Sequence, residues 1–311
     1  MGKNIIKFII LILAVSTGLK AVNLTDYISE ITADPNSASE SLYQLFQNFQ
    51  GYDDPVIKGD LQIGYNSIND TLKAPFIYVL PSSYDPLKST PLLINLHGGV
   101  GRQEFIQDPL EAFKQNIYLS ICEKESWILL IPLGNADCMW WDQTGMLNIK
   151  TLILKMKNEF NIDDDRVYLT GFSDGGSGSF HFALNDPGNF AALYPLNGML
   201  TVGSAVTGIP VYPANLANRP VYAINTDKDG LYPAAEMRKL MQLGLNAGAD
   251  LFYREYWGYG HSFDYADQEL PLMINHMKRT SRNPFPEKIY WECHDPAFGC
   301  CDWLKITKLD T

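Results

Sequence analysis

The sequence predicts an α/β protein whose core is a mostly parallel central sheet with helices on both faces. Three observations lead to this prediction. Short apolar runs bounded by proline and glycine recur along the chain, as buried strands do. Longer segments with apolar residues three and four apart lie between them, as helices do. The two kinds of segment alternate through most of the 311 residues, which is the order of βαβ units.

The expected strands are runs rich in leucine, isoleucine, valine and aromatic residues. Their continuous apolar character indicates burial on both faces, which is typical of parallel strands. In chain order they are residues 74–81 (APFIYVLP), 90–99 (TPLLINLHGG), 126–134 (SWILLIPLG), 166–172 (RVYLTGF), 190–198 (FAALYPLNG), 219–227 (RPVYAINTD) and 251–260 (LFYREYWGYG).

The expected helices are the segments between these strands, and each is long enough to return the chain for a parallel strand. One further helical pattern precedes the first strand, where Leu42, Leu45, Phe46 and Phe49 recur at intervals of three and four. The helical segments between or after the strands are residues 108–125, 147–160, 176–186, 233–248 and 267–280.

The chain divides into four expected parts. Residues 1–21 combine lysines with an apolar run that is too short to cross a bilayer, which is typical of a signal peptide. We therefore expect a secreted or periplasmic protein with no transmembrane segment after signal removal; a buried or anchoring N-terminal helix is the alternative. Residues 22–58 are expected to be a helical segment, 59–283 the main α/β domain, and 284–311 a cysteine-containing tail.

The charge balance excludes one class of partner. The formal net charge is -11, and lysine and arginine are not clustered. Because nucleic acids and anionic membranes attract clustered positive charge, we expect no nucleic-acid partner.

The cysteines leave two interpretations of the tail. Cys293, His294, Cys300 and Cys301 lie close in sequence but lack the paired two-residue spacing of zinc modules. We favour a disulfide from Cys293 to Cys300 or Cys301 over a metal site. With Cys122 and Cys138 the number of cysteines is five, so at least one thiol stays unpaired within the monomer.

Residues 171–176 (GFSDGG) follow an expected strand and open an expected helix. In parallel sheets the chemistry collects at the carboxyl ends of strands, and small residues let a serine sit on a tight strand-to-helix turn there. We therefore predict that Ser173 is a nucleophile rather than a serine in a flexible loop. The backbone N–H of Asp174, not its carboxylate, is expected to face a developing oxyanion, with the helix N-terminus adding positive potential.

The segment HGGVG, residues 97–101, follows the expected strand at 90–99. Glycines directly after a buried strand let backbone N–H groups point at an oxyanion. We therefore expect a second donor from Gly99 or Val100, although a plain turn is the alternative. His97 is expected to shape this loop rather than to act as a base.

Two more strand ends carry an acid and a histidine. Asp229 follows the strand at 219–227 and His261 follows the strand at 251–260, so both are expected at the same edge of the sheet as Ser173. The other histidines, His181, His276 and His294, are expected to be packing or surface residues.

The segment around Asp229 also has a metal-binding interpretation. Its polar residues follow the spacing of an EF-hand calcium loop, but a strand rather than a helix precedes it and a proline occupies position 9. We therefore expect no metal. The residues concerned are Asn225, Asp227, Asp229, Gly230 and Glu236.

The order Ser173, Asp229, His261 after a glycine-rich loop resembles the α/β-hydrolase superfamily. More narrowly, the sequence resembles its secreted esterase group, which includes polyhydroxybutyrate-depolymerase-like, feruloyl-esterase-like and "predicted peptidase" proteins. The resemblance covers Leu61 to Arg279. It is carried by residues 78–99 (YVLPSSYDPLKSTPLLINLHGG), 162–176 (IDDDRVYLTGFSDGG), 224–233 (INTDKDGLYP) and 258–263 (GYGHSF).

The resemblance implies an α/β-hydrolase fold and a serine hydrolase that cleaves carboxylic esters without a cofactor. Ser173 matches the nucleophile of the family, Asp229 the acid and His261 the base. Asp229 is preferred to Asp227 because the family's acid stands four residues before a proline, here Pro233. A peptidase of prolyl-oligopeptidase-like type and a non-catalytic binding protein are the alternative functions.

Trp140 and Trp141 follow the expected strand at 126–134. Aromatic side chains at this edge are expected to line a substrate pocket, with packing in the core as the alternative. The sequence leaves the ester itself open: a small molecule or an acyl group attached to a polymer.

Overall fold

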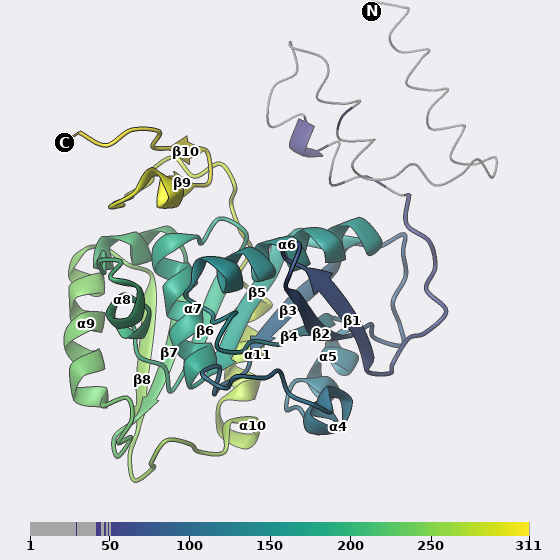
Figure 1. Ribbon diagram of the computed structural model, residues 1–311, viewed down its shortest axis with the longest axis horizontal. Coiled ribbons are helices and arrows are strands. Elements are labelled where there is room, and N and C mark those ends of the chain that lie inside the picture. Colours follow the sequence, from purple (N-terminus) through teal and green to yellow (C-terminus); the bar gives the residue numbers. More distant parts are fainter. Residues whose placement is uncertain (1–28, 30–41, 45–46, 48, 50, 311) are drawn as a thin grey trace, which may run out of the picture.

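The computed structural model describes residues 29, 42–44, 47, 49 and 51–310, and the fold is seen in these (Figure 1). The expected signal peptide, residues 1–21, lies outside the described residues, as does most of the helical pattern before the first strand. Of that pattern, residues 42–44 and 47 are helical, and Phe49 is buried.

The described residues form an eight-stranded sheet in the order β1-β2-β4-β3-β5-β6-β7-β8. Strands β1, β2 and β4 pair antiparallel, and all pairs from β4 through β3 to β8 are parallel. The predicted, mostly parallel sheet is therefore present. The strands are β1 (Gln62–Ser67), β2 (Lys73–Val79), β3 (Thr90–Leu96), β4 (Ile128–Pro132), β5 (Ile162–Phe172), β6 (Ala192–Leu196), β7 (Val221–Thr226) and β8 (Leu251–Tyr256).

Helices cover both faces of this sheet (Figure 1). The helices are α4 (Pro109–Phe113), α5 (Leu119–Glu125), α6 (Gln143–Glu159), α7 (Asp174–Asn185), α8 (Val202–Thr207), α9 (Ala234–Asn246), α10 (Tyr265–Gln268) and α11 (Leu270–Met277), with 3-10 turns η1 (Pro213–Asn218) and η2 (Pro296–Phe298). Successive residues of the central strands point to opposite faces. In β3, Leu92 and Ile94 pack on the side of α6, α7 and α9, and Leu93 packs on the side of α5 and α11.

The tail from residue 284 forms a small hairpin of β9 (Cys300–Cys301) and β10 (Leu304–Lys305). It is held to the domain by Asn215, which bonds the backbone of Glu292 in both directions, and by an ion pair between Arg219 and Asp302. The tail therefore docks on η1 and the start of β7 rather than beside the sheet edge.

The expected disulfide in the tail is not formed, because all five cysteines are free thiols. Neighbouring residues of a strand point to opposite sides, so Cys301 is buried beneath the hairpin while Cys300 faces solvent. The two thiols are therefore not equivalent partners for Cys293, which is only partly buried.

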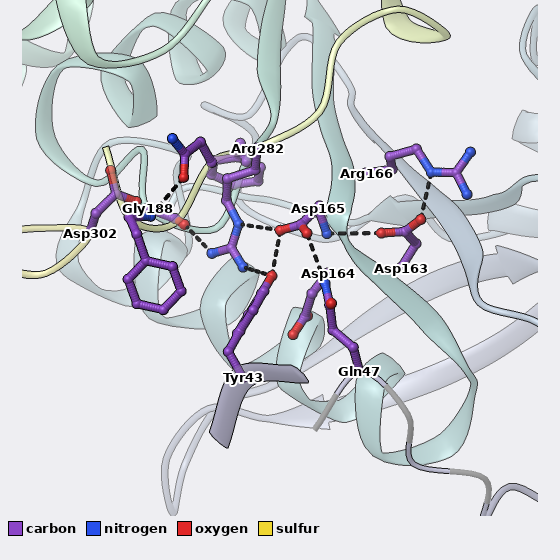
Figure 2. Close-up of polar contacts among 12 residues, drawn as sticks. Tyr43, Gln47, Asp163, Asp164, Asp165, Arg166, Gly188, Arg282 and Asp302 are labelled. Atoms are coloured by element: carbon purple, nitrogen blue, oxygen red, sulfur yellow. Dashed lines mark hydrogen bonds and ion pairs between the residues drawn. The ribbon is translucent and has the colours of Figure 1, made fainter. Parts of the chain in front are cut away.

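Near the start of β5, Asp165 contacts Tyr43 and Gln47 from the N-terminal side of the chain and Arg282 from the chain that follows α11 (Figure 2). Asp165 accepts hydrogen bonds from Tyr43 and from Gln47 Nε2, the latter at 2.8 Å. Arg282 donates to the Tyr43 hydroxyl at 3.0 Å and to the carbonyl oxygen of Gly188 at 2.7 Å, and its Nε lies 3.5 Å from Asp165. Three distant parts of the sequence thus meet at one polar joint.

A cavity of about 280 Å³ lies beside this joint, between Phe49, Tyr52 and the residues 163–166 of β5. Its charged walls are already paired, as Asp163 is with Arg166 and Asp164 with Lys157. It lies at the opposite end of β5 from Ser173, a span on the order of 30 Å for ten extended residues. We assign this cavity no part in the chemistry at the other edge. In the described part of the chain, no helix is long and apolar enough to span a membrane.

Candidate active site

Ser173 stands on the sharp turn between β5 and α7, as the sequence predicts. Its backbone has φ 60° and ψ -120°, a conformation rare for a residue with a side chain. The turn is fixed by a hydrogen bond of 3.0 Å from the Ser173 N–H to the carbonyl oxygen of Leu196 in β6. The hydroxyl is therefore held at the carboxyl end of the central strand, and the residue is partly buried.

The glycines around Ser173 are required by close backbone approach. A Cβ on Gly175 would lie 2.0 Å from the carbonyl oxygen of Leu96 in β3, and one on Gly171 would lie 2.4 Å from the backbone of Gly175. A Cβ on Gly176 would lie 2.6 Å from the carbonyl oxygen of Leu196. These three glycines let α7 begin directly against the sheet.

Ser173, His261 and Asp229 are brought together in one hydrogen-bonded chain. His261 Nε2 lies 2.7 Å from Ser173 Oγ, and His261 Nδ1 lies 2.8 Å from Asp229 Oδ2. With the ring proton on Nδ1 and donated to Asp229, Nε2 presents a lone pair to the serine hydroxyl. The imidazole also contacts the rings of Phe172 and Tyr232, with centroids at 5.1 and 5.4 Å.

The Asp229 side chain is fully buried and accepts four hydrogen bonds. Burial by itself raises the pKa of this carboxyl, but hydrogen bonds from the Tyr232 N–H, Asn197, His261 and the Leu231 N–H outweigh burial and lower its pKa. The carboxylate is therefore held ionised beside the imidazole.

Asp227 bonds to the backbone of a turn and not to His261. Its Oδ1 accepts from the N–H groups of Gly258 and Tyr259, at 2.6 and 3.3 Å, and so fixes the turn after β8. Asp227 and Asp229, two of the three carboxylates in the calcium-like spacing, thus face different partners. Among the described residues, no cluster of three or more histidine, cysteine or acidic side chains is arranged to hold a metal.

Among the described residues, neither the backbone N–H of Gly99 nor that of Asp174 has a hydrogen-bond partner, so both are free to bind an oxyanion. Gly99 has φ 70°, and a Cβ on the preceding Gly98 would come within 3.0 Å of the Ser173 Cβ. The loop therefore lies directly over the serine.

Val100 does not fit the expected role of oxyanion donor. Its N–H already donates to Asp174 Oδ2 at 3.0 Å, and the residue is buried. The carboxylate of Asp174, for which the sequence predicted no role, has a second partner as well: its other oxygen, Oδ1, accepts from the Tyr232 hydroxyl at 2.7 Å.

Tyr232 is a site residue that sequence reasoning missed. Burial, and next the hydrogen bond to Asp174, raise the pKa of its phenol, so the hydroxyl stays protonated and donates. Its place three residues after Asp229 is the signal that could have pointed to it, but the partner, Asp174, is distant in sequence.

Parts of the chain are similar in sequence to two known proteins. No family model matches the chain. A segment of 134 residues is 31% identical to a bifunctional acetylxylan esterase/xylanase of Neocallimastix patriciarum, covering 42% of this chain and 19% of that protein. A segment of 156 residues is 22% identical to dipeptidyl aminopeptidase A of Saccharomyces cerevisiae, covering 46% of this chain and 16% of that protein. The matches span less than a fifth of either relative.

Solved structures match over more of the chain. A thermostable esterase superposes with a TM-score of 0.57 at 21% identity, covering 72% of this chain and 64% of that one. A ferulic acid esterase superposes with a TM-score of 0.55 at 16% identity, covering 71% of this chain and 98% of that one. The chain has the α/β-hydrolase fold. The fold predicted from the sequence is confirmed.

Within the α/β-hydrolase fold, His97 belongs to the support of the glycine loop. Its Nε2 accepts the Gly134 N–H at 3.0 Å, so Nδ1 carries the proton and donates to the Gly98 carbonyl oxygen at 2.8 Å. Burial lowers the pKa of His97 to about 4. The ring is therefore neutral in ordinary buffers and shapes the loop.

Trp140 and Trp141 belong to the core of the α/β-hydrolase fold rather than to a substrate pocket. They are 0% and 4% exposed, and Trp140 Nε1 donates to the carbonyl oxygen of His97 at 2.8 Å. Trp140 packs against α7, since a Cβ added to Gly178 of this helix would lie only 2.4 Å from the Cβ of Trp140. The position after β4 does reach the site's edge, but both rings turn inward.

The remaining histidines lie outside this site. His181 is buried within α7, where burial lowers its pKa to about 4. His276 in α11 bonds the Tyr194 hydroxyl at 2.8 Å, and His294 is exposed in the tail.

Proposed function

We propose that the protein is a secreted serine hydrolase that cleaves carboxylic esters through an acyl-enzyme intermediate. The observation that carries this proposal is the hydrogen-bonded chain from Ser173 Oγ through His261 to Asp229, at 2.7 and 2.8 Å. Nucleophile, base and orienting acid within hydrogen-bond reach of one another are the arrangement that activates a serine.

In the first half-reaction, Ser173 attacks the acyl carbonyl while His261 Nε2 takes the hydroxyl proton. Asp229 stabilises the imidazolium that forms, which its ionised and buried carboxylate is suited to do. The N–H groups of Gly99 and Asp174 bind the oxyanion of the tetrahedral intermediate. A single donor of this kind contributes about 3 kcal/mol to the transition state.

His261 then protonates the leaving alcohol, and the acyl group remains on Ser173. Water enters, gives its proton to His261 and attacks the acyl-enzyme, which releases the acid and restores the serine. The mechanism uses only side chains and backbone groups of this chain.

Ester substrates are favoured by the esterase names among the relatives and structural neighbours. The acetylxylan esterase relative suggests acetyl groups on a polysaccharide as one substrate, alongside small acyl esters. Secretion is proposed from the signal-peptide character of residues 1–21 alone.

The second candidate function is a serine peptidase, which the match to dipeptidyl aminopeptidase A favours. The same nucleophile, base and oxyanion donors serve amide cleavage, so the two functions differ only in the substrate. A binding protein without catalysis is the third possibility, and it differs from both in having no reactive serine.

The test uses the full chain and three variants: Ser173→Ala, His261→Ala and Asp229→Asn. Wild type is expected to react with a fluorophosphonate probe and to hydrolyse p-nitrophenyl acetate. Ser173→Ala and His261→Ala should lose turnover, and Asp229→Asn should lower kcat by about 10⁴-fold, because the imidazole then takes the wrong tautomer.

Three outcomes decide between the functions. Probe labelling that survives in Ser173→Ala contradicts the nucleophile. Faster turnover of dipeptidyl p-nitroanilides than of acetate and ferulate esters favours the peptidase. Absence of both labelling and turnover in a folded wild type favours the binding protein.

A further inference from the structure

We infer that Asp174 is a positioning residue whose carboxylate holds the glycine loop and the acid loop in register over Ser173. The inference rests on the proposed function. Asp174 is the residue directly after the proposed nucleophile, and it opens the 12-residue helix α7. Its two carboxylate oxygens bond two loops that follow different strands: Val100 after β3 and Tyr232 after β7.

The first oxygen fixes the glycine loop. The peptide unit between Gly99 and Val100 is held at both of its polar atoms: the Val100 N–H donates to Asp174 Oδ2 at 3.0 Å, and the Gly99 carbonyl oxygen accepts from Arg102 Nε at 2.8 Å. The plane of this peptide unit therefore cannot rotate without breaking a hydrogen bond.

The neighbouring peptide unit, between Gly98 and Gly99, is held only at its carbonyl oxygen, by His97 Nδ1 at 2.8 Å. Because a trans peptide points its N–H opposite to its carbonyl, this contact turns the Gly99 N–H outward. That N–H is the proposed oxyanion donor. Asp174, Arg102 and His97 together thus set the direction of one N–H group.

The second oxygen fixes the acid loop. The Tyr232 hydroxyl donates to Asp174 Oδ1 at 2.7 Å, and the Tyr232 N–H donates to Asp229 Oδ1 at 3.0 Å. The same residue stacks its ring edge-on against His261. One side chain therefore links Asp174 to both the acid and the base of the proposed triad.

The placement of Asp174 at the start of α7 makes this arrangement stable. The N-terminus of a helix favours a negative charge, and two donors already share the charge of the carboxylate. Both carboxylate oxygens thus accept hydrogen bonds from the two loops, from the Val100 N–H and the Tyr232 hydroxyl, and neither has to face the oxyanion.

The experiment compares Asp174→Ala, Asp174→Asn and Tyr232→Phe, with kcat expressed per active site titrated by the fluorophosphonate. Asp174→Ala should lower kcat for p-nitrophenyl acetate by about 10- to 100-fold with KM changed less than about threefold, because the oxyanion donor is displaced in the transition state. The Ki of a trifluoromethyl ketone, which forms an oxyanion on the serine, should rise by a similar factor.

Asp174→Asn should restore kcat to within about fivefold of wild type, because the amide oxygen accepts from Val100 and the amide nitrogen donates to the tyrosine oxygen. Tyr232→Phe breaks one link only and should fall between wild type and Asp174→Ala. If Asp174→Ala does not fold, a lowered kcat in Tyr232→Phe still tests the inference, and an unchanged kcat there contradicts it.

Asp142→Ala is the matched control, since Asp142 too accepts two hydrogen bonds at a helix start, in its case both from backbone N–H groups, those of Met139 and Gly145 at 2.8 and 2.6 Å. It should lower the melting temperature without changing kcat per titrated site. An unchanged kcat and Ki in Asp174→Ala, or an Asp174→Asn variant as slow as Asp174→Ala, would overturn the inference. Failure of the proposed function would be seen separately, as a wild type without ester turnover or as probe labelling that survives in Ser173→Ala.

Discussion

His97 illustrates at the scale of one residue how burial and two hydrogen bonds determine a protonation state. Its ring accepts the Gly134 N–H and donates to the Gly98 carbonyl oxygen, and this pattern exists only for the neutral imidazole. A proton on Nε2 would break the first bond and bury a charge. This is the physical reason why the pKa of His97 falls to about 4.

Acid should therefore destabilise the protein in a defined range. Between about pH 6.5 and about pH 4 the unfolded chain binds a proton at position 97 that the folded chain does not, so stability is full above this range and falls as pH falls through it. The contribution is at most about 3 kcal/mol. Urea unfolding at pH 7 and pH 4.5 should show a smaller loss in His97→Gln than in wild type.

His294→Gln is the control for this prediction, because His294 is exposed in the tail. It should lose as much stability as wild type between the two pH values. An equal loss in His97→Gln and wild type would contradict the neutral, buried imidazole.

The sequence predicted the residues of the hydrogen-bonded chain, because each follows a strand and the fold brings strand ends together. It did not predict the partners of Asp174, since Val100 and Tyr232 are distant from it in sequence. Nor could it orient Trp140, because a position after a strand does not decide whether a side chain turns toward the core. Such directions depend on packing between elements.

At the scale of elements, the approach of α7 to β3 and β6 is the contact that places Ser173. The helix begins so close to the sheet that its first turn has room for hydrogen atoms only at residues 175 and 176. Further along, α7 is buried on all sides, and its large side chains include Phe180 and Phe182, which are 0% exposed. Small residues at one end and large ones further along set the angle at which the helix leaves the turn.

Gly175→Ala should therefore be strongly destabilising, by about 3 kcal/mol or more, because a methyl group 2.0 Å from the Leu96 carbonyl oxygen must push α7 off the sheet. Thermal unfolding and fluorophosphonate labelling measure the two consequences, a lower melting temperature and slower labelling. Gly101→Ala is the stability control, since nothing lies within 4 Å of its added Cβ. Similar melting temperatures for the two variants would refute the packing argument.

The sequence placed the parallel strands well but missed β1 and joined two helices. In β1 the residues facing the core are few, since only Asn66 is buried, so the strand lacks the apolar run that marked the others. The expected helix at 108–125 is divided into α4 and α5, where Tyr118 and Leu119 each bond to Asn116 instead of extending α4. Edge strands and local turns are weak signals because their stability comes from neighbours.

At the scale of the whole molecule, the joint around Asp165 and Arg282 holds Tyr43, Gln47 and the chain after α11 against the start of β5 (Figure 2). It lies at the end of β5 away from Ser173. The joint and the candidate active site are therefore at opposite edges of the sheet, and one can be weakened without touching the other.

Arg282→Ala should lower the free energy of unfolding by about 2 kcal/mol, because it removes the partly buried cation beside Asp165 and the hydrogen bonds to Tyr43 and Gly188. The kcat of the folded fraction should stay unchanged. Arg166→Ala removes a more exposed pair with Asp163 from the same strand and should cost less than about 1 kcal/mol. Chemical denaturation of both variants checks the difference, and equal losses would show that the joint contributes no more than an exposed ion pair.

The backbone of Ser173 has a consequence for how this protein can change. Holding a residue with a side chain at φ 60° and ψ -120° costs on the order of 1–3 kcal/mol, and glycine alone would adopt it freely. Stability and reactivity thus oppose each other at this position. A substitution to glycine relaxes the turn but removes the hydroxyl. A lineage that keeps the proposed nucleophile must therefore gain its stability through changes elsewhere in the sheet and its helices.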